Sequence, residues 1–204
     1  MFARRTPGIP VLGEEQGGEY TDGPLWVVDP LDGTTNFVLG FPFYAVSIAL
    51  QNVGRSDVGV VIDAVRGHEY TARRGHGAFR DTERLAVSDT REFSRALVGT
   101  GFPYDRTQRA AYYLQYVERV LTRAGGIRRA GAAALDLAMI AEGALDAYWE
   151  FNLAIWDVAA GVLLVEEAGG TVTGTDGGRY DRVRPSIIAA NPHLHPVLLG
   201  LLQS

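Results

Sequence analysis

The stretch WVVDPLDGTTNF, residues 26–37, decides how this chain folds and where its chemistry lies. A short apolar run at 25–29 ends in the carboxylate of Asp29 and is followed by turn-forming residues. We expect a buried strand that delivers side chains to a loop, in which Pro30 directs the turn and Asp32 returns a second carboxylate close to the first. Two carboxylates so placed repel each other strongly unless a divalent cation lies between them. The stretch therefore predicts a hard, oxygen-liking metal.

The residues that follow suit an anionic ligand. Gly33 lets the backbone come close to a ligand, while Thr34 and Thr35 offer hydroxyl and N–H groups where a short helix could begin. Taken alone, the DPLDG fragment fits an ordinary turn with solvated aspartates equally well, because such fragments occur in many unrelated proteins. The full stretch is much rarer, so other parts of the chain decide between the two interpretations.

The composition narrows the possible functions. The chain has 204 residues, of which 47% are hydrophobic, and this is enough to bury a substantial core within a single domain, 1–204. The formal net charge of −5 gives no polycationic field that would attract nucleic acid or an anionic membrane. All 19 basic residues are arginines, which excludes a lysine Schiff base and a P-loop lysine. We therefore expect a small-molecule or protein partner.

The chain contains no cysteine, which excludes a disulfide scaffold, a thiolate nucleophile and a zinc site built on sulfur. Its first residues carry two arginines with no apolar run behind them, and no uncharged apolar run is long enough to span a bilayer. The sequence therefore predicts a soluble, cytoplasmic protein that makes no membrane contact.

The hydrophobic periodicity predicts a mixed fold. Strand-like patterns dominate the first half, and helical spacing appears in the second half. No repeat, low-complexity tract or linker marks a domain boundary. Besides the strand at 25–29, we expect strands at 43–53, 57–65, 68–72, 77–80, 96–100, 145–151 and 186–190, and helices at 107–123, 132–141, 156–168 and from about residue 193. A further strand is expected between the helices at 107–123 and 132–141.

Two further blocks decide how the central stretch is interpreted. Gly13-Glu14-Glu15 lies upstream, and Trp156-Asp157-Val158-Ala159-Ala160-Gly161 lies downstream. These three blocks, in this order, resemble the inositol monophosphatase family. The resemblance extends along nearly the whole chain, and GTGFP at 99–103 with Arg128-Arg129 is most similar to the bacterial branch. It implies an α+β fold, the layered αβαβα sandwich shared with fructose-1,6-bisphosphatase.

The resemblance assigns a Mg²⁺ site. Glu14, Asp29 and the backbone carbonyl of Leu31 would hold a first ion, and Asp29, Asp32 and Asp157 a second. Magnesium prefers oxygen ligands and keeps several waters, so the donor set is chemically reasonable. Glu15 is interpreted as a solvated neighbour or a hydrogen-bond partner of the loop. Asp157 has an alternative role as the N-cap of the helix that it precedes, and the two roles are compatible.

The resemblance also assigns a substrate-binding wall. Glu150 corresponds to the acid that hydrogen-bonds substrate hydroxyls, and Arg128 is a further candidate. Each could instead be an ordinary surface or interface residue. The full set implied for substrate binding is Asp32, Gly33, Thr34, Arg128, Gly131, Ala132, Ala133, Glu150 and Asp157.

The reaction implied is Mg²⁺-dependent, lithium-sensitive hydrolysis of a phosphate monoester by in-line attack of water. In the family the water is oriented by the threonine at Thr34, paired with an aspartate on a segment ahead of the Glu-Glu motif. Only twelve residues precede Gly13 here, and residues 1–12 resemble the end of a helix and its exit turn. We therefore expect an N-terminally truncated domain that lacks part of the outer helical layer and leaves an apolar sheet face exposed.

Several functions share these metal motifs. The wall at 131–133 and Glu150 favour myo-inositol monophosphate, a small phosphorylated polyol, as the substrate. Fructose-1,6-bisphosphatase, histidinol-phosphate phosphatase and 3′-phosphonucleotide phosphatase remain alternatives, as does a non-enzymatic interaction protein. The resemblance also implies a homodimer.

Overall fold

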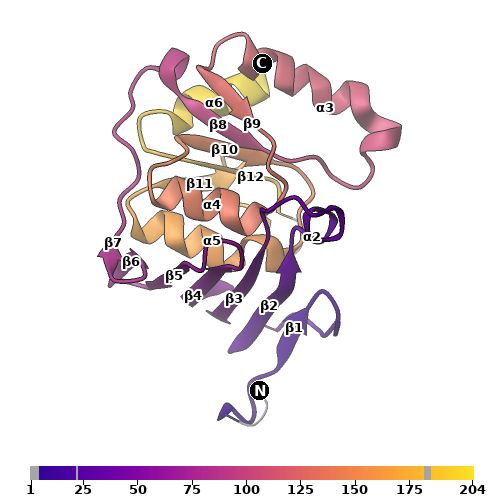
Figure 1. The fold of residues 1–204 in the computed structure, drawn as a ribbon, viewed down its shortest axis with the longest axis vertical. Coiled ribbons are helices and arrows are strands. Elements are labelled where there is room, and N and C mark those ends of the chain that lie inside the picture. The colour runs from indigo at the N-terminus through magenta and orange to yellow at the C-terminus, as the bar shows by residue number, and fades with distance from the viewer. Residues whose placement is uncertain (1–4, 22, 182–184) are drawn as a thin grey trace.

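The computed structural model describes residues 5–21, 23–181 and 185–204. A first sheet is formed by the N-terminal half of the chain, with its strands in sequence order (Figure 1). β1 runs parallel to β2, and every later neighbour is antiparallel, as in a meander. The strands are β1 (Val11–Gly13), β2 (Leu25–Asp32), β3 (Ala45–Asn52), β4 (Arg55–Asp63), β5 (Glu69–Arg73), β6 (Gly77–Arg80) and β7 (Glu83–Arg84).

A second, mixed sheet is formed by the C-terminal half. Its strand order is β11-β12-β10-β8-β9. β12 is antiparallel to both of its neighbours, whereas β10 is parallel to β8 and β8 is parallel to β9. The strands are β8 (Leu97–Thr100), β9 (Gly126–Arg128), β10 (Ala147–Glu150), β11 (Thr171–Gly174) and β12 (Ile187–Ala190).

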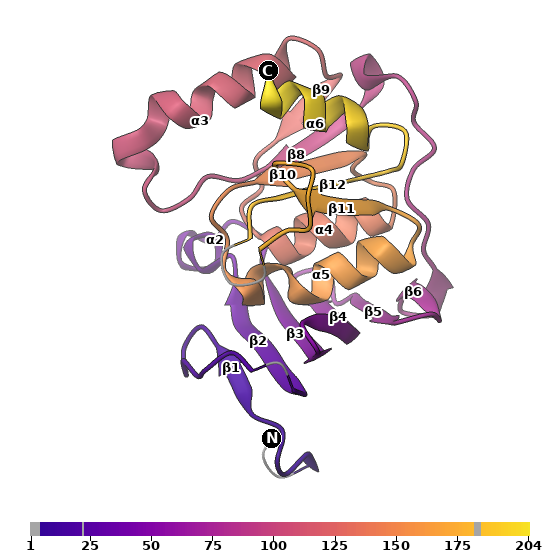
Figure 2. The same cartoon turned by 180° about the vertical axis from the view of Figure 1, so that it is seen from behind.

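The helices separate and cover these sheets. α4 and α5 lie between the two sheets, and α3 and α6 cover the far face of the second sheet (Figures 1 and 2). The layered α+β sandwich predicted from the sequence is confirmed. In the described part of the chain, no helix lies on the outer face of the first sheet. The helices are α2 (Thr34–Leu39), α3 (Arg106–Leu121), α4 (Ala133–Ala141), α5 (Ile155–Glu167) and α6 (His195–Gln203), with a short 3₁₀ turn at Phe93–Arg95.

The position of α5 explains its composition. A helix between two sheets must be apolar around most of its circumference, and Leu163 and Leu164 are both fully buried. Each such side chain contributes about 1.5–3 kcal/mol by leaving water. A Cβ on Gly161 would lie 2.6 Å from Cβ of Leu137 in α4, so a glycine is needed where the two helices cross. Tight packing here fixes where the first turns of both helices lie.

Some predicted elements differ from the structure. The strand expected at 25–29 runs on to Asp32, and β1, β7 and β11 had no counterpart among the predictions. Of the segment 1–12, interpreted as a helix end and exit turn, residues 1–4 lie outside the described residues. Arg5 is helical and a bend and turn follow at 6–8, as expected, but Val11 and Leu12 belong to a strand paired with β2. Among the helices of the described residues, none combines the length and apolar character needed to span a bilayer.

Candidate active site

A β-bulge in β2 brings the two aspartates of the central motif onto the same face. Asp29 pairs with Ser47, and Asp32 pairs with Ala45, so two residues of β2 face one residue of β3 between these pairs. Side chains alternate along a strand, and without the extra residue Asp32 would point to the opposite face from Asp29. Both aspartates are buried. Pro30 lies within the bulge, where its missing N–H is tolerated, so the expected turn is an irregularity within a continuous strand.

Hydrogen bonds fix the geometry of this motif. The Leu31 N–H donates to Asp29 Oδ1 over 2.9 Å, and the Thr34 hydroxyl donates to the Leu31 carbonyl over 2.9 Å. The N–H of Ala134, in the first turn of α4, donates to Asp32 Oδ2 over 2.8 Å. The helix N-terminus thus orients the carboxylate and partly offsets its charge. α2 begins at Thr34, as the sequence predicted.

Position 33 requires glycine for two reasons, its backbone conformation and the atoms packed around it. It adopts a left-handed conformation with φ of 87°. A Cβ there would lie 3.0 Å from the Phe43 carbonyl oxygen and 3.1 Å from Cβ of Ala132. Ala132 is itself buried, so its methyl group packs behind the motif. A larger residue at position 33 would have to displace the segment that precedes β3 or the residue that precedes α4.

Asp157 occupies the first turn of α5. It is the third helical residue, and its Oδ2 accepts the backbone N–H of Ala154, the N-cap residue, over 2.7 Å. The alternative that Asp157 is itself the N-cap is therefore wrong. Ala154 has no side-chain acceptor, so only the carboxylate half of a capping box is present. This bond uses one carboxylate oxygen and leaves the other available to a ligand.

The parallel pairing of β1 with β2 brings Glu14 beside Asp29. Gly13 lies opposite Val28, and a Cβ on Gly13 would meet the Val28 carbonyl oxygen at 2.9 Å. Only glycine allows this close approach. Glu14 follows directly and lines the same pocket as Asp29, whereas Glu15 does not line it, in line with its interpretation as a solvated neighbour.

The carboxyl groups of Asp29, Asp32 and Asp157 resist ionisation. Burial, with a smaller contribution from neighbouring acids, raises the pKa of Asp29 to about 6 and that of Asp157 to about 7, although a backbone N–H that donates to each carboxylate opposes the increase. Burial and the charges of Asp157 and Asp29 hold the pKa of Asp32 well above its usual range. Clustered acids that need neutralising, together with an all-oxygen donor set, fit a hard divalent cation. In the described part of the chain, no three acidic or histidine side chains are already gathered as a ready-made ion site.

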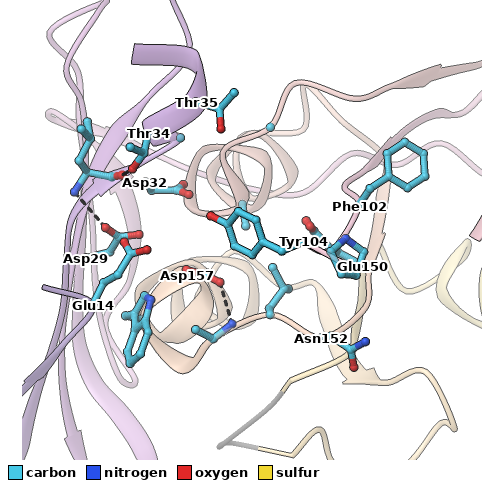
Figure 3. Close-up of a pocket in the computed structure, with 18 of the residues that line it drawn as sticks. Glu14, Asp29, Asp32, Thr34, Thr35, Phe102, Tyr104, Glu150, Asn152 and Asp157 are labelled. Atoms are coloured by element: carbon cyan, nitrogen blue, oxygen red, sulfur yellow. Dashed lines mark hydrogen bonds between the residues drawn. The ribbon is translucent and has the colours of Figure 1, made fainter. Parts of the chain in front are cut away.

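These carboxylates line one pocket of about 810 Å³ between the two sheets (Figure 3). The acids of β2 and α5 form one wall, and Glu150 and Asn152 lie across from them. Of the residues predicted from the sequence, the structure brings these to the pocket: Glu14, Asp29, Leu31, Asp32, Gly33, Thr34, Gly131, Ala133, Glu150 and Asp157.

Glu150 ends β10 and is held by its neighbours on the second sheet. The Tyr148 hydroxyl donates to its carboxylate, and burial raises the pKa of Glu150 to about 7. A Cβ on Gly101 would lie only 2.1 Å from Glu150 Oε2, so a glycine after β8 makes room for this carboxylate. The group is thus fixed in direction and carries a proton for part of the neutral pH range.

Comparison with known proteins agrees with this geometry. The profile of the inositol monophosphatase family matches residues 2–204. The chain belongs to the inositol monophosphatase family. The chain is 43% identical over 209 residues to inositol-1-monophosphatase of Caulobacter vibrioides, a phosphoric monoester hydrolase, covering all of this chain and 82% of that protein. It is 47% identical over 204 residues to Nus factor SuhB of Pseudomonas aeruginosa, covering 97% of this chain and 75% of that protein.

A solved structure shows the same arrangement. Inositol monophosphatase from Anabaena (Nostoc) superimposes with a TM-score of 0.95 at 40% identity, covering 99% of this chain and 81% of the other. The fold and the family of this chain are therefore established.

Two residues predicted for the substrate wall of this family member lie outside the pocket lining. Arg128 is exposed, and its guanidinium donates to the Ile127 carbonyl at 3.0 Å. The neighbouring Arg129, the first residue after β9, lines the pocket instead. Ala132 packs behind Gly33 as described above. The predicted segment thus reaches the pocket, but through Arg129 and Gly131 rather than through Arg128.

Other lining residues carried no clear signal in the sequence. Phe102 and Tyr104 come from the loop between β8 and α3, Asn152 follows β10, and Arg106 is the first residue of α3. A periodicity pattern predicts neither the path of a loop nor the exact residue at which a helix begins. Asn36 was also missed: its side-chain amide donates to the carbonyls of Phe43, Ala130 and Gly131, over 2.7, 2.9 and 3.3 Å. It ties the carboxylate wall to the Gly131 segment.

Proposed function

We propose that this chain hydrolyses myo-inositol monophosphate to inositol and phosphate in a Mg²⁺-dependent reaction. One observation carries the proposal. Acidic side chains that a cation would neutralise line one side of the pocket, and the fixed carboxylate of Glu150, which can accept hydrogen bonds from hydroxyl groups, lies on the other side. Asp29 and Asp32 are buried and Asp157 is partly buried, and a buried acid costs stability unless its charge is compensated. A pocket lined by these acids and by the exposed Glu14 therefore fits a metal-dependent enzyme better than an interaction protein. The arrangement favours catalysis.

The carboxylates of Glu14, Asp29, Asp32 and Asp157 and the carbonyl oxygen of Leu31 would hold Mg²⁺. When bound, the ion supplies positive charge against the phosphoryl oxygens and acidifies the attacking water. The protein contributes preorganisation, because Asp32 and Asp157 are oriented by backbone N–H groups of α4 and α5. These two carboxylates are therefore already oriented and need little movement as the transition state forms.

Thr34 suits the orientation of water. Its hydroxyl proton is engaged by the Leu31 carbonyl, which leaves the Thr34 oxygen as an acceptor. A water that donates to this oxygen would have a lone pair directed away from it, toward the pocket that Thr34 lines. Thr34 thereby acts as a positioning residue for the nucleophile, and its effect is on alignment.

The opposite wall suits a polyol. Glu150 can accept hydrogen bonds from adjacent hydroxyl groups, and Gly131 has no side chain to obstruct the polyol ring. A charged acceptor of this kind contributes about 1.5–3 kcal/mol per hydrogen bond. The same walls could accept other sugar phosphates, so fructose 1,6-bisphosphate, histidinol phosphate and a 3′-phosphonucleotide are the competing substrates. Inhibition by lithium, a homodimer and a cytoplasmic location are further predictions that rest on the family resemblance.

The test is phosphate release from this panel of esters, with Mg²⁺ and with excess chelator. We expect Mg²⁺-dependent turnover with the highest kcat/KM for inositol monophosphate. Glu150→Gln should raise KM for inositol monophosphate about tenfold or more while changing an aryl phosphate little. Glu118→Gln, an exposed acid on α3, is the matched control. Turnover that survives the chelator, or equal losses on both esters, would contradict the proposal.

A further inference from the structure

Tyr104 occupies an unusual position in the pocket. The residue lies on the loop between β8 and α3 and lines the pocket, yet 87% of it is exposed. Figure 3 shows its ring projecting between the acids of the first sheet and Glu150. A large aromatic side chain normally packs against protein, and one that projects into a pocket is available to a ligand.

The hydroxyl end of Tyr104 faces the acid wall. The pKa of Tyr104 lies above its ordinary value, first because protein atoms near the hydroxyl hinder hydration of the phenolate, and then because of nearby negative charge. The charges responsible belong, in decreasing order, to Glu14, Asp157, Asp29 and Asp32. The phenol therefore keeps its proton at neutral pH and remains a hydrogen-bond donor beside groups that, when ionised, can only accept.

The loop that carries Tyr104 is anchored at both sides. Gly101 lies against Glu150, as described above. The Tyr113 hydroxyl donates to Asp105 Oδ1 over 2.8 Å, and the Asn152 side-chain amide donates to the same hydroxyl over 3.4 Å. These contacts join the loop to α3 and to the residue after β10. They hold the backbone of Tyr104 at the mouth of the pocket.

We infer that the Tyr104 hydroxyl donates a hydrogen bond to a phosphoryl oxygen of the bound ester, which makes Tyr104 a substrate-binding residue of this chain. This inference rests on the proposed function. The phosphate, and not the polyol, is the expected hydrogen-bond acceptor because the Tyr104 hydroxyl faces the acids that would hold Mg²⁺. Glu150, on the polyol side, already accepts from Tyr148. Tyr104 would thus add a donor to the phosphate on the open side of the pocket.

The test compares Tyr104→Phe, which removes one oxygen atom, with the unaltered chain. Binding of inorganic phosphate is measured by calorimetry in the presence of Mg²⁺, and this readout requires no turnover. We expect Tyr104→Phe to weaken phosphate binding about tenfold and to raise KM by a similar factor for inositol monophosphate and for an aryl phosphate. Tyr112→Phe on α3 lies outside the pocket lining and should leave both quantities unchanged.

The outcomes separate this inference from the proposed function. If inositol monophosphate is not a substrate but Tyr104→Phe still weakens phosphate binding, the inference stands and the substrate assignment fails. If Tyr104→Phe equals the unaltered chain in phosphate affinity, the inference is overturned, even where turnover is normal. An effect limited to inositol monophosphate would also overturn it, because the hydroxyl would then contact the polyol. Failure of the unaltered chain to bind phosphate would overturn it too.

Discussion

The two sheets of this molecule are covered differently. In the second sheet, all of β12 and nearly all of β10 are buried, because helices pack on both faces. In the first sheet, β2 and β3 alternate between buried and partly exposed positions, and α4 and α5 cover one face. Continuous apolar runs suit a sheet buried on both sides, and alternation suits a sheet buried on one side.

The sheets also contribute differently to the pocket. The first sheet supplies the acids of the DPLDG motif by means of a bulge, and the second supplies Glu150 at the end of a buried strand. The first turns of α4 and α5 reach the pocket between them. Under the proposed function, the first sheet would thus supply most of the groups that hold Mg²⁺, and the second sheet would supply the group that recognises the alcohol. Damage to the first should affect every ester, and damage to the second should affect the choice of ester.

The largest effect is expected at Asp32. Asp32→Asn should lower kcat by about 10³-fold or more for every ester, because a group that would hold Mg²⁺ loses its charge. The fold should survive, since an amide oxygen can still accept the Ala134 N–H and burial disfavours the charge in any case. Kinetics on two esters and the metal-free thermal midpoint test this. A loss of kcat for only one ester would contradict the proposal that the first sheet serves every ester.

A smaller and more selective effect is expected at Gly101. A methyl group on Gly101→Ala would collide with the Glu150 carboxylate and displace it. We expect KM for inositol monophosphate to rise about tenfold or more, as for loss of a hydrogen bond to a charged group, with little change for an aryl phosphate. Gly23→Ala is the control, because nothing lies within 4 Å of the added atom. Equal losses on both esters would mean that Gly101 serves the fold alone.

Much of this site could be predicted from the sequence, for a physical reason. The acids lie in contiguous motifs whose local backbone fixes their direction, so Asp29, Asp32 and Asp157 reach the pocket as expected. The bulge at Pro30 was interpreted as a turn, because a proline after an apolar run predicts either feature. Only the observed pairing with β3 distinguishes them.

What the sequence did not predict lies where the chain leaves regular structure. Tyr104 and Asn152 reach the pocket from loops, and Asn152 adopts a left-handed φ of 51° that no periodicity predicts. The choice between Arg128 and Arg129 depends on the exact residue at which β9 ends. Strand ends shift by a residue or two in any assignment, and one residue reverses the direction of a side chain.

Substitution of Arg128 and Arg129 tests which of the two side chains acts in the pocket. Arg129→Gln should raise KM for inositol monophosphate about two- to fivefold, because its charge lies in the pocket and lowers the pKa values of Glu150 and Asp136. The effect is modest because Arg129 is exposed and its charge is screened by water. Arg128→Gln should stay close to the unaltered chain. A larger effect at Arg128 would restore the original assignment and require that segment to turn differently.

The last prediction concerns the stability of the metal-free protein and tests how deeply the end of β10 is buried. Because the pKa of Glu150 rises from 4.5 to about 7 on folding, the folded state binds this proton more tightly than the unfolded chain does. The resulting stabilisation is fully present below pH 4.5 and is lost as the pH rises through about 7, by at most about 3 kcal/mol. Glu150→Gln is neutral at every pH and can still accept from Tyr148. Its free energy of unfolding should therefore fall less between pH 5 and pH 8, as measured by urea denaturation.

The control for this prediction is Glu118→Gln, measured under identical conditions. It is needed because Asp136, Tyr148 and Arg129 also interact electrostatically with Glu150 and contribute to the pH dependence of stability in both variants. Parallel stability curves for the two variants would show that Glu150 is ionised in the folded protein and that this end of the sheet is more hydrated than its burial implies.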